Sequence, residues 1–154
     1  MKIVTTNRKA KHDYKILEVY DAGIVLNGNE VKSLRINGAS IDESFCRVEE
    51  GEVLVYSMHI PEFIKASYFR PDPRRPRKLL LHKNEIKKLF GATTQKGSTI
   101  IPLKVYFNDK GLAKIEIGIA RGVHRYDKRR KIKEEIVKRE SAQALKQARR
   151  NYLK

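Results

Sequence analysis

Apolar and polar residues alternate with a period of two in two segments, residues 103–107 and 115–119. Between them, residues 108–111 read Asn-Asp-Lys-Gly, which suits a four-residue hairpin loop. Successive side chains of a strand point to opposite faces, so one face should be buried and the other exposed to water. The pattern therefore predicts an antiparallel hairpin with one wet face.

Three further segments read as strands. Residues 14–26 are rich in aromatic and β-branched side chains, and Gly23 within them predicts a bulge or sharp bend. Residues 45–48 and 53–58 flank the turn-forming residues 49–52, Glu-Glu-Gly-Glu, and predict a second hairpin.

Two short helices are expected at residues 29–35 and 83–90, where apolar residues recur three or four positions apart. Gly91 follows the second segment and is expected to cap its C-terminal end. Several short strands with turn signals indicate a mainly β protein, either a small barrel or a sandwich.

A basic segment rich in proline occupies residues 66–78. Its three prolines disfavour a helix or a central strand. The segment is expected to be a stiff loop that cannot pack inward, and its arginines are candidate phosphate contacts.

The net charge of the chain indicates what kind of partner it binds. The 154 residues include 34 Lys and Arg against 18 Asp and Glu, a net charge of +16. Such an excess indicates a polyanionic partner, either nucleic acid or an anionic membrane surface.

More than half of this excess lies in the last part of the chain, because residues 121–154 contain 13 basic and 4 acidic residues. We therefore expect a folded domain at residues 1–121 and a basic tail at residues 122–154. Ordering a residue costs about 1–2 kcal/mol, and the tail has few apolar residues to offset that cost. It is expected to be disordered when free and helical against a partner, the alternative being a solvated helix docked on the folded domain.

The sequence offers no case for catalysis. Its four histidines are scattered, and it contains no HExxH, paired CxxC or phosphate-loop motif. Cys46 is expected to be a small core residue, and His59 a core or interface residue. No metal or cofactor is expected. A lone cysteine, the absence of an N-terminal signal and the absence of an apolar run of about 20 residues suit a cytoplasmic protein.

Two places combine basic and aromatic side chains in the way that nucleic-acid-binding surfaces do. One is the run at residues 7–14, which contains Arg8, Lys9 and Lys11 and ends at Tyr14. The other is the wet face of the last hairpin, with Lys104, Tyr106 and Lys114. A solvated terminal arm and ordinary exposed strand residues are the respective alternatives.

The sequence resembles the SsrA-binding protein family, also called small protein B. The resemblance rests on several segments that occur in the family's order and spacing: residues 7–10 (Asn-Arg-Lys-Ala), 22–26 (Ala-Gly-Ile-Val-Leu), 28–35 (Gly-Asn-Glu-Val-Lys-Ser-Leu-Arg), 77–82 (Arg-Lys-Leu-Leu-Leu-His), 102–107 (Pro-Leu-Lys-Val-Tyr-Phe), 117–122 (Ile-Gly-Ile-Ala-Arg-Gly) and 126–129 (Tyr-Asp-Lys-Arg). It implies an oligonucleotide-binding-like closed β-barrel with two or three short helices and a C-terminal tail.

The matching positions, with the basic residues of these segments, give the expected functional residues. The expected RNA contacts are Asn7, Arg8, Lys9, Lys11, Tyr14, Asp21, Lys32, Arg35, Leu80, His82, Lys114 and Arg121. The tail residues expected to engage the ribosome are Gly122, Tyr126, Asp127, Lys128 and Arg129. Asp21 stands where many members have Glu, His82 where some have Asn, and Tyr126 where some have His. Stacking, rather than proton transfer, is therefore expected of Tyr126.

The resemblance implies binding to the tRNA-like domain of transfer-messenger RNA and delivery of that RNA to stalled ribosomes, whose peptides are then tagged. The tail would enter the decoding centre and the empty message channel. Elongation factor Tu would be an indirect partner through the charged RNA, and the free protein is expected to be a monomer. Other readings are a generic RNA-binding or ribosomal barrel, an RNA-processing enzyme, and a membrane-surface protein.

Overall fold

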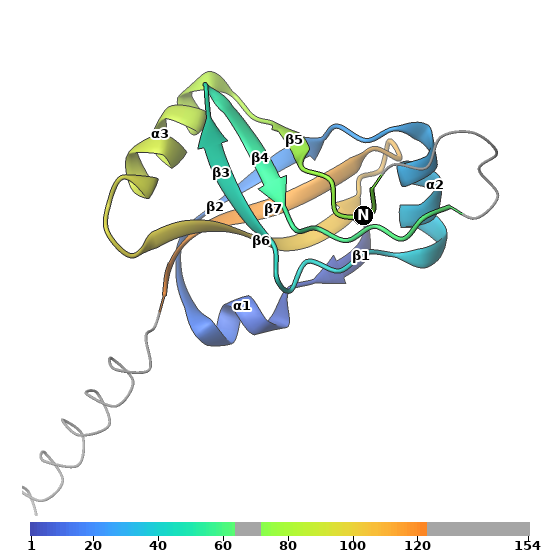
Figure 1. Cartoon of the computed structure of the whole chain (residues 1–154), viewed down its shortest axis with the longest axis horizontal. Helices are drawn as coiled ribbons and strands as arrows, with labels where there is room; N and C mark the ends of the chain where they lie inside the picture. The colour runs from blue at the N-terminus through green and yellow to red at the C-terminus, as the bar shows by residue number, and fades with distance from the viewer. Residues whose placement is uncertain (64–71, 123–154) are drawn as a thin grey trace, which may run out of the picture. The chain divides into compact units, whose positions relative to one another are not determined.

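A computed structural model describes residues 1–63 and 72–122, and the elements below belong to these residues (Figure 1). The strands are β1 (Lys2–Thr6), β2 (Tyr14–Ile24), β3 (Phe45–Glu49), β4 (Glu52–Tyr56), β5 (Arg77–Leu80), β6 (Ser98–Phe107) and β7 (Ala113–Gly122). The helices are α1 (Arg8–Asp13), α2 (Gly28–Asn37) and α3 (Lys83–Thr93). The prediction of a mainly β fold is confirmed. The predicted division between domain and tail remains a prediction, and β7 extends one residue past it, to Gly122.

The strands pair antiparallel in the order β1-β6-β3-β4-β5-β2-β7, and β7 also pairs with β6, so the pairings from β6 to β7 form a ring to which β1 is added at β6. Two junctions of this ring are short. One residue pair joins β3 to β6, and two pairs join β2 to β5. The closed oligonucleotide-binding-like barrel therefore remains a prediction.

Both predicted hairpins are confirmed as β3–β4 and β6–β7. In the first, Glu50 and Gly51 have φ angles of 51° and 76°, the left-handed pair that a two-residue hairpin turn requires. In the second, the Asn108 side-chain oxygen accepts from the backbone nitrogens of Lys110 and Leu112 at 3.0 and 2.9 Å. Local turn chemistry thus fixes the register of each hairpin.

Strand β2 differs from the prediction at Gly23. The strand runs without interruption through this residue, and its register shift lies instead between Ile16 and Glu18. Next to this shift, the Ile16 side chain packs over Gly118 on β7. A side-chain carbon there would lie 3.1 Å from Ile16 and 3.1 Å from Leu103, so these two side chains occupy the space above Gly118.

The main core is formed by inward-facing side chains of β2 to β7, with Leu34 of α2 and Leu89 of α3. Cys46 is buried within it, as expected, and burial raises the pKa of its thiol. A second cluster joins Ala10 of α1 to Ile101 and Leu103 of β6. The prediction of one face exposed to water is therefore wrong for this part of β6, because α1 and the Tyr14 and Ile16 side chains of β2 pack against it.

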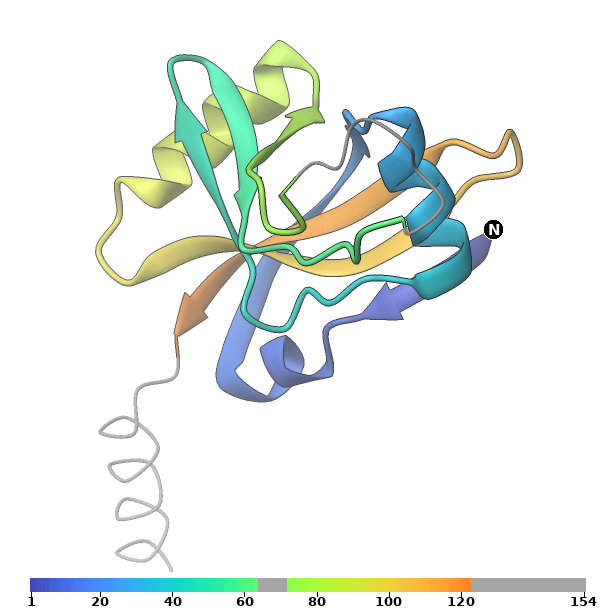
Figure 2. The same ribbon diagram turned by 45° about the vertical axis from the view of Figure 1, so that its right-hand side comes forward.

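The three helices lie at different sides of the strands (Figures 1 and 2). Figure 2 shows α2 and α3 at opposite ends of the strands, while α1 packs against β2 and β6. Helix α3 continues through Gly91 to Thr93, so the predicted glycine cap is wrong. The hydroxyls of Thr93 and Thr94 donate to the carbonyls of Phe90 and Gly91, which partners the last turn without a glycine.

The C-terminal part of the proline-rich segment packs inward, contrary to the prediction. Arg77 is fully buried and donates to Glu30 at 2.7 Å, to the Met58 carbonyl at 2.6 Å and to the Pro73 carbonyl at 3.0 Å. Arg75 also binds Glu30. These two arginines hold the fold together and are not free phosphate contacts, while residues 66–71 of the segment lie outside the described residues.

Candidate nucleic-acid interface

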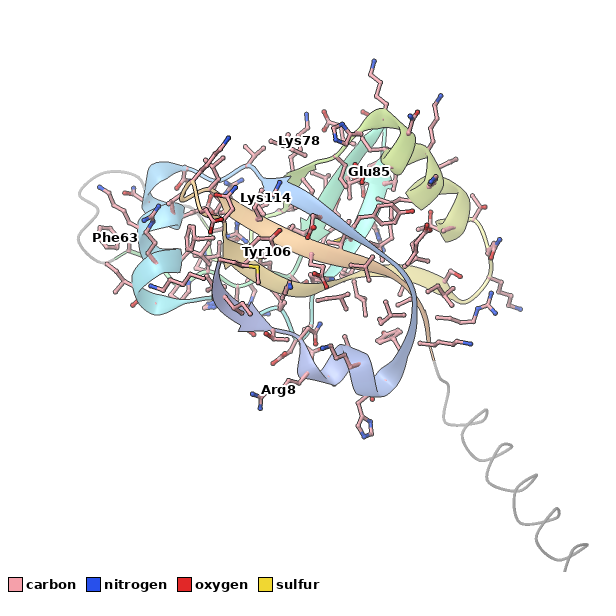
Figure 3. All side chains as sticks on the ribbon, turned by 180° about the vertical axis from the view of Figure 1, so that it is seen from behind. Arg8, Phe63, Lys78, Glu85, Tyr106 and Lys114 are labelled. Atoms are coloured by element: carbon pink, nitrogen blue, oxygen red, sulfur yellow. The ribbon has the colours of Figure 1, made fainter. Side chains whose placement is uncertain are left out.

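A groove of about 800 Å³ lies where β2, β5, the start of α3 and the β6–β7 loop meet. It brings together four of the expected RNA contacts, Asp21, Leu80, His82 and Lys114, which come from widely separated parts of the chain. Its full lining is Val19, Tyr20, Asp21, Gly23, Ile24, Leu26, Val31, Leu80, Leu81, His82, Glu85, Gly111, Leu112, Ala113 and Lys114. Figure 3 shows Lys114 and Glu85 on the elements that border it.

Strand pairing sets the floor of the groove. Gly23 on β2 is paired with Leu80 on β5 and with Lys114 on β7. Gly23 therefore sits between two longer side chains, and a carbon added to it would lie 3.4 Å from the Leu80 side chain. The absence of a side chain at Gly23 leaves a notch between an apolar neighbour and a cationic one.

Apolar side chains at the rim are unusually exposed. Leu80 is 54% exposed, Leu112 59% and Val19 48%. Exposed apolar side chains that surround a polar notch suit a ligand that has flat apolar surfaces as well as polar edges. A nucleotide has both, in its base and in its ribose and phosphate.

The polar groups of the groove are of both signs. Lys114 supplies positive charge, while Asp21 and Glu85 supply carboxylates. Glu85 accepts from the backbone nitrogen of His82 at 3.0 Å and so anchors the start of α3, leaving the His82 side chain exposed. Asp21 accepts from the hydroxyl of Tyr106 at 3.1 Å. The groove can thus neutralise a phosphate and also accept hydrogen bonds from a base.

A second, smaller hollow of about 240 Å³ contains Asn7, Lys9 and Tyr14. It is also lined by Asp13, Asp42 and Glu43, and the Lys9 ammonium is paired with Glu43 at 3.1 Å. The hydrogen bond from this pair raises the pKa of Lys9. Because carboxylates dominate this hollow, it suits a phosphate less well than the groove does.

Asn7 differs from the expectation of an RNA contact. It is buried, and its side-chain nitrogen donates to the carbonyls of Ile41 at 3.2 Å and Pro102 at 3.0 Å. Its side-chain oxygen accepts from the Ala10 backbone nitrogen at 3.0 Å, which caps α1. Asn7 therefore anchors α1 to β6, and both N–H groups of its side chain already have partners within the protein.

The remaining expected contacts are spread over the surface. Arg8 and Lys11 are exposed on α1, and Arg8 points outward in Figure 3. Lys32 lies 5.9 Å from the ring centroid of Phe63. Arg35 donates to the Gly111 carbonyl at 3.0 Å and steadies the β6–β7 loop.

At the end of β7, Arg121 is exposed, and Gly122, which was expected to be the first residue of the tail, is the last residue of the strand and is paired with Tyr14. The other expected tail residues, Tyr126, Asp127, Lys128 and Arg129, lie outside the described residues. The expected disorder and helix of the tail lie outside them as well.

The sequence did not indicate several groove residues, including Val19 and Leu112 at its rim and Gly23 on its floor. It also predicted Tyr106 on a wet face, whereas this residue is 8% exposed and faces Asp21. One signal could have found part of the groove. Val19, Asp21 and Gly23 are two residues apart, so they share one face of β2.

Within residues 1–63 and 72–122, no three His, Cys, Asp or Glu side chains are grouped in a way that could hold a metal ion. Among the helices of the same residues, none is both long and apolar enough to cross a membrane. The expectations of no metal and no cofactor remain predictions.

The large positive charge and a groove that combines lysine, carboxylates and exposed apolar side chains are typical of nucleic-acid-binding β proteins. Comparison with known proteins narrows this class. The family model described as "SmpB protein" matches residues 4–147. The chain belongs to the SmpB family.

Curated relatives agree over nearly the whole chain. The "SsrA-binding protein" of a Nitratiruptor species is 51% identical over 150 residues, which is 97% of this chain and 100% of that protein. The "SsrA-binding protein" of Thermus thermophilus is 52% identical over 136 residues, 88% of this chain and 94% of that protein.

A solved structure is similar as well. It is described as "tmRNA-SmpB: a journey to the center of the bacterial ribosome". One of its chains matches with a TM-score of 0.68 and 52% identity, covering 87% of this chain and 94% of that chain. The family resemblance that the sequence motifs indicated is thereby confirmed.

Proposed function

We propose that this protein binds the tRNA-like domain of transfer-messenger RNA and delivers that RNA to stalled ribosomes for trans-translation. The relatives are named for binding SsrA RNA, and the similar structure is named for transfer-messenger RNA and the bacterial ribosome. The observation that carries the proposal is the groove, which unites four expected RNA contacts from β2, β5, the start of α3 and β7. The protein acts by binding and not as an enzyme.

Each side of the groove suits a different part of an RNA. The Lys114 ammonium would neutralise a phosphate, and the exposed Leu80 side chain would pack against a base or ribose. The Asp21 carboxylate would accept from an N–H or hydroxyl group, and the His82 imidazole would hydrogen-bond beside it. A folded loop that displays base edges and a bent backbone together offers such contacts, whereas a regular duplex hides most base edges.

The basic tail completes the proposal. Residues 123–154 would become ordered inside the decoding centre and the empty message channel, where Tyr126, Asp127, Lys128 and Arg129 would meet ribosomal RNA. Ordering would succeed only where the surroundings supply contacts and negative charge, since the tail itself is rich in basic residues. Elongation factor Tu would be an indirect partner, the free protein a monomer, and the cytoplasm its place of action.

Competition binding tests the RNA preference. Full-length protein is titrated into labelled tRNA-like domain in the presence of excess bulk tRNA at fixed salt. The proposal expects the labelled RNA to stay bound, while a generic RNA-binding protein would lose it to the competitor.

A pair of variants then tests the groove. Lys114→Ala should weaken binding about 5- to 30-fold, and Lys88→Ala, which removes an exposed lysine outside the groove, should change it little. Equal effects of the two substitutions would show that charge alone, and not the groove, holds the RNA.

A further inference from the structure

Tyr106 makes a contact that crosses a whole strand. It lies on β6, paired with Lys114 of β7, while Asp21 lies on β2 at the other side of β7. The Tyr106 hydroxyl nevertheless donates to Asp21 Oδ1 at 3.1 Å. Figure 3 shows Tyr106 and Lys114 on neighbouring strands of this face. The Tyr106 side chain thus passes over β7 and ends at the edge of the groove.

The tyrosine is held firmly, while the aspartate is exposed. Tyr106 is 8% exposed, and the Lys104 ammonium lies 5.5 Å from its ring centroid. Lys104 also pairs with Glu116 at 3.2 Å, and Glu116 is the residue paired with Asp21 across the strands. Lys104 therefore offsets a negative charge that would otherwise repel the Asp21 carboxylate.

From this geometry we infer that Tyr106 is a positioning residue for RNA binding, and the inference rests on the proposed function. Its hydroxyl occupies Asp21 Oδ1 and limits the rotation of an exposed side chain. Among residues 1–63 and 72–122, no hydrogen bond reaches the other oxygen, Oδ2. Asp21 is exposed and lines the groove, so this oxygen can accept from a donor group of a ligand.

The charge of the Asp21 carboxylate determines which groups of a ligand it can bind. An ionised carboxylate accepts hydrogen bonds and cannot donate, so it binds an N–H of a base or a ribose hydroxyl and repels phosphate. Lys114 also lines the groove and lies opposite Gly23, two residues along β2 from Asp21. Its ammonium group attracts phosphate and donates hydrogen bonds. Together, Asp21 and Lys114 select a nucleotide whose base edge faces Asp21 while its phosphate faces Lys114. Tyr106 fixes the position of the Asp21 carboxylate relative to Lys114.

A double-mutant cycle on RNA affinity tests this role. Tyr106→Phe removes the hydroxyl and keeps the ring, and it should weaken binding of the tRNA-like domain about 3- to 10-fold. Asp21→Ala should weaken it at least as much. If Tyr106 acts through Asp21, then adding Tyr106→Phe to Asp21→Ala should cause almost no further loss.

Tyr56→Phe is the matched control. The Tyr56 hydroxyl also donates to a carboxylate, Glu49, at 2.7 Å, but this pair lies on β3 and β4 outside the groove. Its removal should leave RNA affinity unchanged. Thermal unfolding of each variant verifies that it is folded at the assay temperature, and Asp21→Leu, which also removes the acceptor for Tyr106, serves as a second variant if Asp21→Ala is unstable.

The outcomes separate this inference from the proposed function. Losses for Tyr106→Phe and Asp21→Ala that multiply in the double variant would show that Tyr106 acts independently, which overturns the inference. An unchanged affinity for Tyr106→Phe beside a weakened Asp21→Ala would overturn it too, with the proposed function intact. If the wild-type protein showed no preference for the tRNA-like domain over bulk tRNA, both the inference about Tyr106 and the proposed function would be overturned.

Discussion

Glu30 is the residue whose change tests the energetics of the fold most sharply. It is 3% exposed and accepts from Arg77 at 2.7 Å and from Arg75 Nε at 3.1 Å. It also accepts from the Asn27 backbone nitrogen at 3.1 Å, which caps α2. Glu30→Gln keeps the size and one oxygen for that cap, so it removes mainly the charge. The fully buried Arg77 guanidinium would then face a neutral amide.

The expected cost follows from the burial of the two partners. Removing one member of a buried ion pair costs about 3–5 kcal/mol, because the other charge is left uncompensated. Arg75 is 33% exposed and can turn toward water, and Arg77 keeps two carbonyl partners. The lower end, about 3 kcal/mol, is therefore expected. That loss is a large share of a total stability of about 5–15 kcal/mol and would lower Tm by roughly 10–15 °C.

Urea unfolding followed by circular dichroism measures this loss. The matched control is Glu52→Gln, which breaks the exposed pair between Glu52 and Lys78, 3.1 Å apart and about half exposed. Exposed pairs contribute at most about 1 kcal/mol, so the control should be nearly neutral. If Glu30→Gln destabilised the protein no more than Glu52→Gln, burial of the Glu30–Arg77 pair would not set the cost of breaking it.

Three further outcomes follow from the structure. Burial alone would raise the pKa of Glu30, but hydrogen bonds from Arg75, Asn27 and Arg77 outweigh it and lower that pKa. Ionised Glu30 therefore stabilises the fold fully above its unfolded pKa of about 4.3, and this contribution is lost as the pH falls through the lower pKa of the folded state. The difference in the free energy of unfolding between wild type and Glu30→Gln should therefore shrink in acid. Asn7→Ala should cost about 1–3 kcal/mol in urea unfolding, because it removes a helix cap and one hydrogen bond at each of two buried carbonyls. The RNA affinity of the folded variant should be unchanged, and a selective loss of affinity would contradict the structural role of Asn7. Cys46, buried and with a raised thiol pKa, should react with an alkylating reagent only after unfolding, and rapid labelling of native protein would contradict its place in the core.

Local sequence patterns predicted the two hairpins because alternation and turn residues act over a few positions. They missed α1 because residues 8–13 carry no apolar stripe, and Ala10 is the one residue of that helix that is buried. The helix exists because Asn7 is anchored to the carbonyls of Ile41 and Pro102, which are distant in sequence. Tertiary hydrogen bonds of this kind have no local signature.

The prediction made from the charge of the proline-rich segment was wrong for a similar reason. Arg77 read as a surface residue of a basic loop, but Glu30, 47 positions earlier, supplies the partner that allows its burial. The resemblance to a known family placed Asp21, Leu80, His82 and Lys114 among the RNA contacts, and strand pairing then brought them together. The notch at Gly23 and the reach of Tyr106 across β7 depend on cross-strand register, which the sequence alone does not contain.

Site-specific cross-linking shows which surface of the protein contacts the RNA. A photoreactive side chain is placed at position 80, at the rim of the groove, or at position 47, an exposed site on β3, and each variant is irradiated with full-length transfer-messenger RNA. Cross-links from position 80 that map to the tRNA-like domain, with few or none from position 47, are the predicted result. Strong binding accompanied by cross-links from position 47 and none from position 80 would contradict the groove as the RNA-binding site.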